Sequence, residues 1–176
     1  MILGMSVAAF TQLHVVISLI GVATGLIVVW GMMSAYKPPV TTALFLLTTV
    51  LTSVTGFMFP FTAFGPPEIV GVISLVALGV ALLALYVFGL AGAWRWLYVV
   101  TSLTALWLNC FVAVAQTFAK VPFFNALAPH QTEPPFAIAQ LIVLAAFIAL
   151  GVAAVKKFHP AAVTPILAQG LERPKA

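Results

Sequence analysis

Few side chains in this sequence could do chemistry, and the most informative of them is a histidine inside an apolar stretch. His14 has apolar residues on both sides, and Ser74, Asn109, Gln116 and Gln140 also interrupt long apolar segments. An imidazole can donate or accept a hydrogen bond or ligate a metal, and amides and hydroxyls can bind carbonyl groups. A histidine and an amide beside apolar walls would suit the head of a quinone. These five residues form the candidate ligand-binding layer.

Other catalytic and metal-binding patterns are missing from the sequence. It has one cysteine, no aspartate and three acidic residues, which excludes disulfide scaffolds, thiolate metal sites and zinc-protease motifs. Only His14 of the three histidines lies in an apolar stretch, so a four-histidine, two-haem arrangement is excluded. A single haem held by His14 and His130 stays open. We predict no metal site and no catalytic residue, and consider only a quinone or a haem as a cofactor.

The composition indicates an integral membrane protein. Of the 176 residues, 64% are apolar and only 6% are charged, whereas soluble domains carry about 25% charged residues. The net charge of +4 comes from few residues, so no dense basic face for nucleic acid is expected. Crossing a bilayer takes roughly 20 apolar residues, and five stretches meet that length. We predict an all-α, compact five-helix bundle with spans at residues 8–32, 41–61, 68–90, 95–118 and 135–155.

Proline pairs and basic residues set the limits and the direction of these spans. Pro38-Pro39, Pro66-Pro67 and Pro134-Pro135 precede the second, third and fifth spans, where a missing N–H costs least. Six of the seven basic residues fall on the side of the C-terminus and only Lys120 falls on the other. The positive-inside rule then predicts the N-terminus outside and the C-terminus in the cytoplasm. Residues 1–160 are expected to form one domain, followed by a cytoplasmic tail at 161–176.

The predicted direction places several polar residues at one depth. His14, Thr55, Ser74, Gln116 and Gln140 all fall in the outer third of their spans, about 10 Å below the surface for the histidine. We therefore expect His14 to be neutral and to hydrogen-bond with Gln116, Gln140 or Ser74, since an unpartnered imidazole is costly there. It is either a packing residue or a ligand.

A heptad of polar residues marks the fourth span. Arg95, Ser102, Asn109 and Gln116 follow one another at seven-residue spacing and should face the bundle interior rather than lipid. The first span has a narrow face of small and polar residues that should pack against this stripe. Its members are Thr11, His14, Ser18, Gly21 and Gly25.

The outer loop at residues 120–134 is either an interfacial cap or a lid over the bundle. As a lid it would bring His130 and Glu133 above the polar layer, with Lys120 pairing to Glu133.

Four segments carry a resemblance. They are 12–18 (QLHVVIS), 51–57 (LTSVTGF), 115–122 (AQTFAKVP) and 128–136 (APHQTEPPF). With them the chain resembles a family of small, uncharacterised multi-span proteins of the bacterial inner membrane. The resemblance implies that setting and brings no activity with it.

Three functions follow as hypotheses. The first is a non-enzymatic subunit or accessory protein of a membrane complex or homo-oligomer. The second is a redox-accessory protein that binds a quinone, haem or lipid through the layer around His14. The third is a small carrier or channel.

Overall fold

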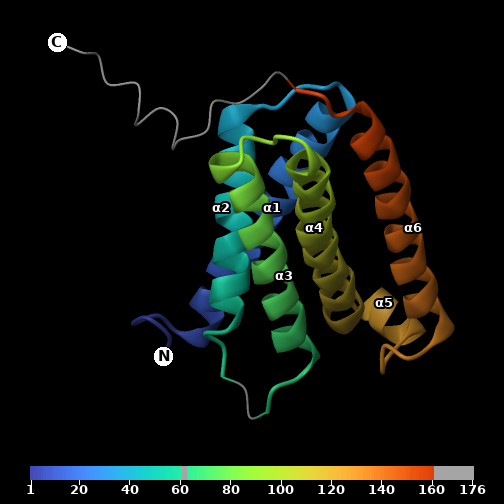
Figure 1. Cartoon of the computed structure of the whole chain (residues 1–176). Coiled ribbons are helices and arrows are strands. Elements are labelled where there is room, and N and C mark those ends of the chain that lie inside the picture. The colour runs from blue at the N-terminus through green and yellow to red at the C-terminus, as the bar shows by residue number, and fades with distance from the viewer. Residues whose placement is uncertain (61–62, 161–176) are drawn as a thin grey trace.

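The computed structural model describes residues 1–60 and 63–160, and these form helices without a β-strand (Figure 1). Five of the helices are long and apolar enough to cross a membrane, as the sequence predicts. They are α1 (Val7–Met33), α2 (Pro39–Gly56), α3 (Pro66–Leu82), α4 (Ala93–Lys120) and α6 (Pro134–Lys157). A π-helical turn, η1 (Leu83–Val87), extends α3, and a short helix, α5 (Pro122–Leu127), lies between α4 and α6. The predicted tail lies outside the described residues.

The helices begin where the sequence indicates. Pro39, Pro66 and Pro134 are the first residues of α2, α3 and α6, positions where the fixed φ of proline suits the helix and its missing N–H is not needed. The first helix begins differently, because Ser6 caps it with a hydrogen bond from the Ala9 amide at 3.2 Å. Local chemistry therefore sets the starts of all four helices.

Two helix ends differ from the prediction. The second span ends at Gly56 and not at residue 61, because Pro60 has no N–H and its ring clashes with the carbonyl four residues earlier. The third span ends in η1, followed by left-handed backbone angles at Gly89 and Leu90 (φ 56° and 63°). At both helix ends the chain turns sharply into the loop that leads to the next helix.

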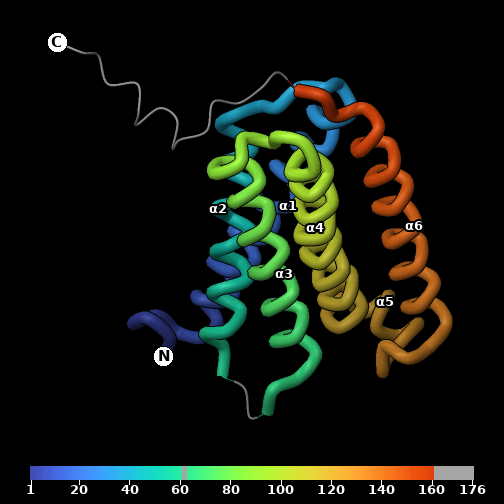
Figure 2. Tube along the Cα trace, viewed as in Figure 1, coloured from blue at the N-terminus to red at the C-terminus, as the bar shows by residue number. Residues whose placement is uncertain are grey.

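The five long helices alternate in direction. The N-terminus, the connection from α2 to α3, and α5 lie at one end of the molecule, which we call the N-terminal end (Figure 2). The α1–α2 and α3–α4 connections and the end of α6 lie at the other end, which we call the basic end. Helix α4 contacts every other helix, and α1 packs most extensively against α2.

The hydrophobic core fills the basic half of the bundle. Its largest fully buried members include Met32, Phe45, Leu85, Tyr98 and Phe158. These come from the ends of α1, α3 and α6 and the beginnings of α2 and α4, all near the basic end. The opposite half of the same helices carries fewer large buried side chains, and His14, Ser53, Ser74 and Asn109 lie there.

Helix α6 makes the bundle less compact than expected. Only 6% of its apolar stretch is buried, and it contacts mainly α4. At the basic end the Arg95 guanidinium donates to the Phe158 carbonyl at 2.6 Å, which ties α4 to the end of α6. A helix that is apolar all round needs no protein partner in lipid, where helices gain no hydrophobic free energy by associating.

Candidate ligand-binding cavity

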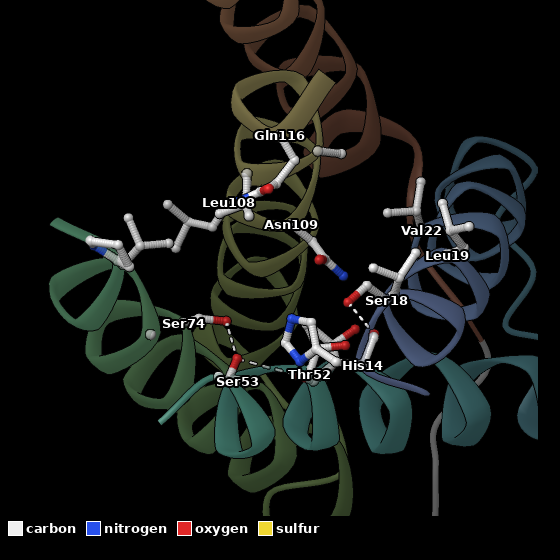
Figure 3. Close-up of a pocket in the computed structure, with 18 of the residues that line it drawn as sticks. His14, Ser18, Leu19, Val22, Thr52, Ser53, Ser74, Leu108, Asn109 and Gln116 are labelled. Atoms are coloured by element: carbon white, nitrogen blue, oxygen red, sulfur yellow. Dashed lines mark hydrogen bonds between the residues drawn. The ribbon is translucent and has the colours of Figure 1, made fainter. Parts of the chain in front are cut away.

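A cavity of about 750 Å³ opens between α1, α2, α3 and α4 in the N-terminal half of the bundle. Its walls are mainly apolar, and polar side chains from all four helices converge on it (Figure 3). The polar and charged residues that line it are Thr11, His14, Ser18, Thr49, Thr52, Ser53, Glu68, Ser74, Asn109, Gln116, Thr117 and Lys120.

His14 is hydrogen-bonded, as the sequence predicts. Its Nδ1 lies 2.8 Å from the Thr55 hydroxyl of α2, and its ring meets the edge of Phe59 with centroids 5.3 Å apart. The second ring nitrogen, Nε2, has no hydrogen-bond partner among the described residues. The partner is Thr55 rather than Gln116, Gln140 or Ser74, because α1 packs most closely against α2.

Two further polar groups lie deeper in the cavity. The hydroxyls of Ser53 and Ser74 are 3.0 Å apart and join α2 to α3. Asn109 is 9% exposed, and within the described ranges its amide nitrogen is buried without a hydrogen-bond partner. That nitrogen packs beside Gly21, where an added Cβ would lie 3.2 Å from it. The small residue on α1 is what lets the Asn109 amide fit.

The polar heptad of α4 has more than one environment. Ser102 and Asn109 are buried in the bundle, which confirms the expectation that they face protein. Gln116 lines the cavity although its side chain is exposed. Arg95 lies at the basic end and binds the end of α6 instead. Only Asn109 and Gln116, the C-terminal half of the heptad, therefore belong to the site.

Gln140 does not join the layer, contrary to the expectation from its depth. Its amide donates to the Phe111 carbonyl of α4 at 3.1 Å, and it does not line the cavity. The reason is the position of α6, which lies beside α4 and away from the opening between α1, α2 and α3. The expectation from depth did not include the direction of the side chain, which reaches α4 and not the cavity.

The outer loop is not a lid over the cavity. Phe124 of α5 packs on Phe118 of α4 with centroids 5.3 Å apart, and the Gln131 amide donates to the Ala115 carbonyl at 2.9 Å. These contacts hold the loop against α4. Lys120 lines the cavity, whereas His130 does not. The geometry therefore does not support a haem held by His14 and His130.

The Glu133 side chain binds the loop that precedes α6 instead of pairing with Lys120. Its carboxylate accepts hydrogen bonds from the backbone amides of His130 and Thr132 at 3.2 and 3.0 Å. Slight desolvation raises the pKa of Glu133, but the backbone hydrogen bonds and the nearby His130 outweigh it, so that the pKa lies below its ordinary value. The Glu133 carboxylate is ionised at neutral pH.

Sequence reasoning missed several cavity residues on α2 and α3. Thr49, Thr52 and Ser53 belong to a run of hydroxyl residues at 48–55 whose spacing of three and four places them on one face of a helix. That run was a usable signal. Glu68 lines the opening, although its place beside the prolines indicated only a helix start.

Comparison of the chain with known protein families, with curated proteins and with solved structures finds no match. In the described ranges 1–60 and 63–160, no group of three or more His, Cys, Asp or Glu side chains could hold a metal ion.

Proposed function

We propose that this chain is an integral membrane protein that binds one amphipathic molecule in the cavity between α1 and α4. The observation that carries the proposal is a cavity of about 750 Å³ with apolar walls and polar groups from four helices. Small-molecule sites typically measure about 300–1,000 Å³ and combine apolar walls with a few polar groups. The polar head would lie at His14 and Ser74, and the apolar part along the walls.

Packing alone is a poor explanation for this cavity. Protein interiors are close-packed, and voids larger than a water molecule are few. The basic half of the bundle follows that rule, with fully buried Phe45 and Tyr98 filling the space between the same helices. A hollow of this size in the half that contains the histidine and the hydroxyls is typical of a binding site.

Filling the cavity tests this proposal. Ala113 lines the cavity on α4, so Ala113→Phe should exclude the ligand. Ala149 is exposed on α6 and does not line the cavity, and Ala149→Phe is the matched control. Mass spectrometry of lipids and quinones bound to gently purified protein should find a molecule with wild type and Ala149→Phe that is lost with Ala113→Phe. Equal bound content in all three proteins would refute the proposal.

The orientation and location belong to the proposal too. By their positions relative to the helix bounds, the described basic residues at the basic end are Lys37, Arg95, Lys156 and Lys157, and Lys120 is at the other end. This asymmetry supports insertion in a bacterial inner membrane with the N-terminal end outside. In a Cys110→Ser background, a membrane-impermeant thiol reagent should label Ala126→Cys in intact cells and Lys157→Cys only after lysis. The reverse pattern would refute the orientation.

A second candidate function is a subunit of a larger membrane complex or a homo-oligomer. The observation that favours it is α6, which is almost unburied against its own chain. Native electrophoresis after mild solubilisation should then show the chain migrating in a larger assembly. Bulky substitutions on exposed α6 residues such as Ala145 should disrupt that assembly, and those on exposed Val76 of α3 should not. Migration as a single chain would exclude this candidate.

A further inference from the structure

Most hydroxyl groups of the cavity donate their protons to backbone carbonyls of their own helices. Thr11 donates to the Val7 carbonyl at 2.8 Å, Ser18 to the His14 carbonyl at 2.8 Å, and Thr52 to the Thr48 carbonyl at 2.9 Å. A hydroxyl has one proton and two lone pairs. Once the proton points back along its own helix, only lone pairs are left for a ligand. These side chains therefore offer hydrogen-bond acceptors to the cavity.

The same reasoning assigns the tautomer of His14. Thr55 also donates along its helix, with its hydroxyl 2.6 Å from the Leu51 carbonyl. A carbonyl has no proton, so the proton in that contact belongs to Thr55. The Thr55 oxygen must then accept from His14 Nδ1, which carries the ring proton. Burial and the positive charge of Lys120 at the same cavity favour the neutral ring. Nε2 is consequently a free acceptor.

Hydrogen-bond donors are scarce beside these acceptors. The amide nitrogen of Asn109 packs against Gly21 and is shielded from the cavity. Ser53 lies within reach of both the Thr49 carbonyl (3.1 Å) and Ser74 (3.0 Å), so this serine pair has at most one proton to give. The remaining donors, Gln116 and Lys120, lie in the last two turns of α4.

We infer that the ligand's polar head is itself a hydrogen-bond donor, and that a lipophilic hydroquinone binds in preference to its quinone. The inference depends on the proposed function, since it names the chemistry of the molecule in the cavity. A hydroquinone O–H can donate to His14 Nε2, whereas a quinone oxygen at the same place is an acceptor and would face the Nε2 lone pair. The inference concerns binding, and no electron transfer is part of it.

A redox pair with one carbon skeleton tests this preference directly. Decylubiquinol and decylubiquinone have the same tail and ring, and differ by two hydrogen atoms. Binding to the purified protein in detergent should be at least about tenfold tighter for the quinol, the size expected when an acceptor loses its only donor. Equal binding of the two forms, or tighter binding of the quinone, would overturn the inference.

Thr55→Val tests the positioning role of the threonine. Valine has nearly the same shape but cannot accept from Nδ1, so the ring proton can move to Nε2 and the preference for the quinol should shrink. Thr104 makes the same kind of bond, to the Val100 carbonyl at 2.9 Å, and does not line the cavity. Thr104→Val is therefore the matched control and should keep the full preference. If Thr55→Val kept the full preference for the quinol, the role assigned to the His14 tautomer would be wrong.

A spectroscopic measurement needs no ligand. In protein labelled with ¹⁵N-histidine, the ring nitrogens of His14, assigned with a His14→Leu variant, should show a protonated Nδ1 and an unprotonated Nε2 at neutral pH. The opposite tautomer would overturn the inference even if ligands bind.

The outcomes separate the two proposals. If both redox forms bind equally and Ala113→Phe removes both, the cavity binds ligands and the donor preference is wrong. If neither form binds and no molecule co-purifies, the proposed function fails and the ligand inference fails with it.

Discussion

At the scale of single residues, Gly25 determines how closely α1, α2 and α4 approach one another between the cavity and the basic end. A Cβ at this position would lie 2.5 Å from a methyl carbon of Leu106 and 2.9 Å from the ring of Phe45, both of which are buried. These side chains belong to the packed half of the bundle, where little space is available for adjustment. Glycine is therefore needed at this position for the close approach of the helices and not for a turn.

Gly25→Ala should destabilise the protein by about 1–3 kcal/mol, the usual cost of overpacking a core. Gly79 of α3 is the matched control, because an added Cβ there meets nothing within 4 Å. Gly79→Ala should leave stability unchanged or raise it by up to about 1 kcal/mol, since alanine favours the helix. Unfolding in mixed detergent micelles gives both values. Equal effects of the two substitutions would contradict the role assigned to Gly25.

The sequence predicts a hydrogen bond to His14 but not its partner. The cost of an unpartnered imidazole in a membrane depends only on depth, and depth follows from span limits and direction. Which residue becomes the partner depends on the rotation of each helix about its axis. Nothing in an apolar helix of low amphipathicity fixes that rotation, and so the sequence indicates Gln116, Gln140 or Ser74 as the partner and not Thr55.

At the scale of helices, Arg95 is the main polar link between α4 and α6. Its guanidinium reaches the carbonyls of Phe158 and Val155 at 2.6 and 3.5 Å, groups that have no partner within their own helix end. A cation at this position also interacts favourably with the negative end of the helix dipole. The rest of the α4–α6 contact consists largely of apolar packing.

Arg95→Ala should therefore cost about 1.5–3 kcal/mol, the range for a hydrogen bond to a charged group. Labelling of a cysteine placed at His159 should become faster as the end of α6 separates from α4. Lys157→Ala is the control, because this exposed lysine makes no hydrogen bond in the described part of the chain, and it should change stability by less than about 0.5 kcal/mol. Unchanged labelling in Arg95→Ala would show that apolar contacts alone hold α6.

Helix limits were largely predictable, and the exceptions have local causes. Prolines act through their own backbone, so the starts at Pro39, Pro66 and Pro134 follow from the sequence. The early end of α2 was predictable on the same ground, because Pro60 lies inside the expected span. The short helix α5 depends on aromatic packing against Phe118, a tertiary contact that the sequence of the loop does not indicate.

At the scale of the whole molecule, the bundle has a packed half and a hollow half. All residues that line the cavity lie between Thr11 and Val121, whereas α6 contributes to the core at the basic end through Ala154 and Phe158. The residues that line the cavity are therefore different from the residues that attach α6 to the bundle. The sequence predicts five spans but not this division, which depends on the sizes of side chains that meet across four helices.

A chain that ends at Pro129 should consequently insert and bind decylubiquinol with unchanged affinity, because it keeps every residue of the cavity and loses only α6. A chain that ends at Gly92 lacks α4 and one wall of the cavity, and should not bind. Loss of binding in the longer fragment would show that α6 shapes the cavity from a distance.

The central place of α4 has a consequence for synthesis of the protein. Chains emerge from the ribosome with the N-terminus first, so α1, α2 and α3 enter the membrane before the helix that all of them contact. Until α4 arrives, Gly21 has Thr48 and Thr49 of α2 beside it but not the Asn109 amide, and the cavity lacks the wall that α4 provides. The arrival of α4 is then the step that completes the cavity, and a ligand present at that moment can be enclosed.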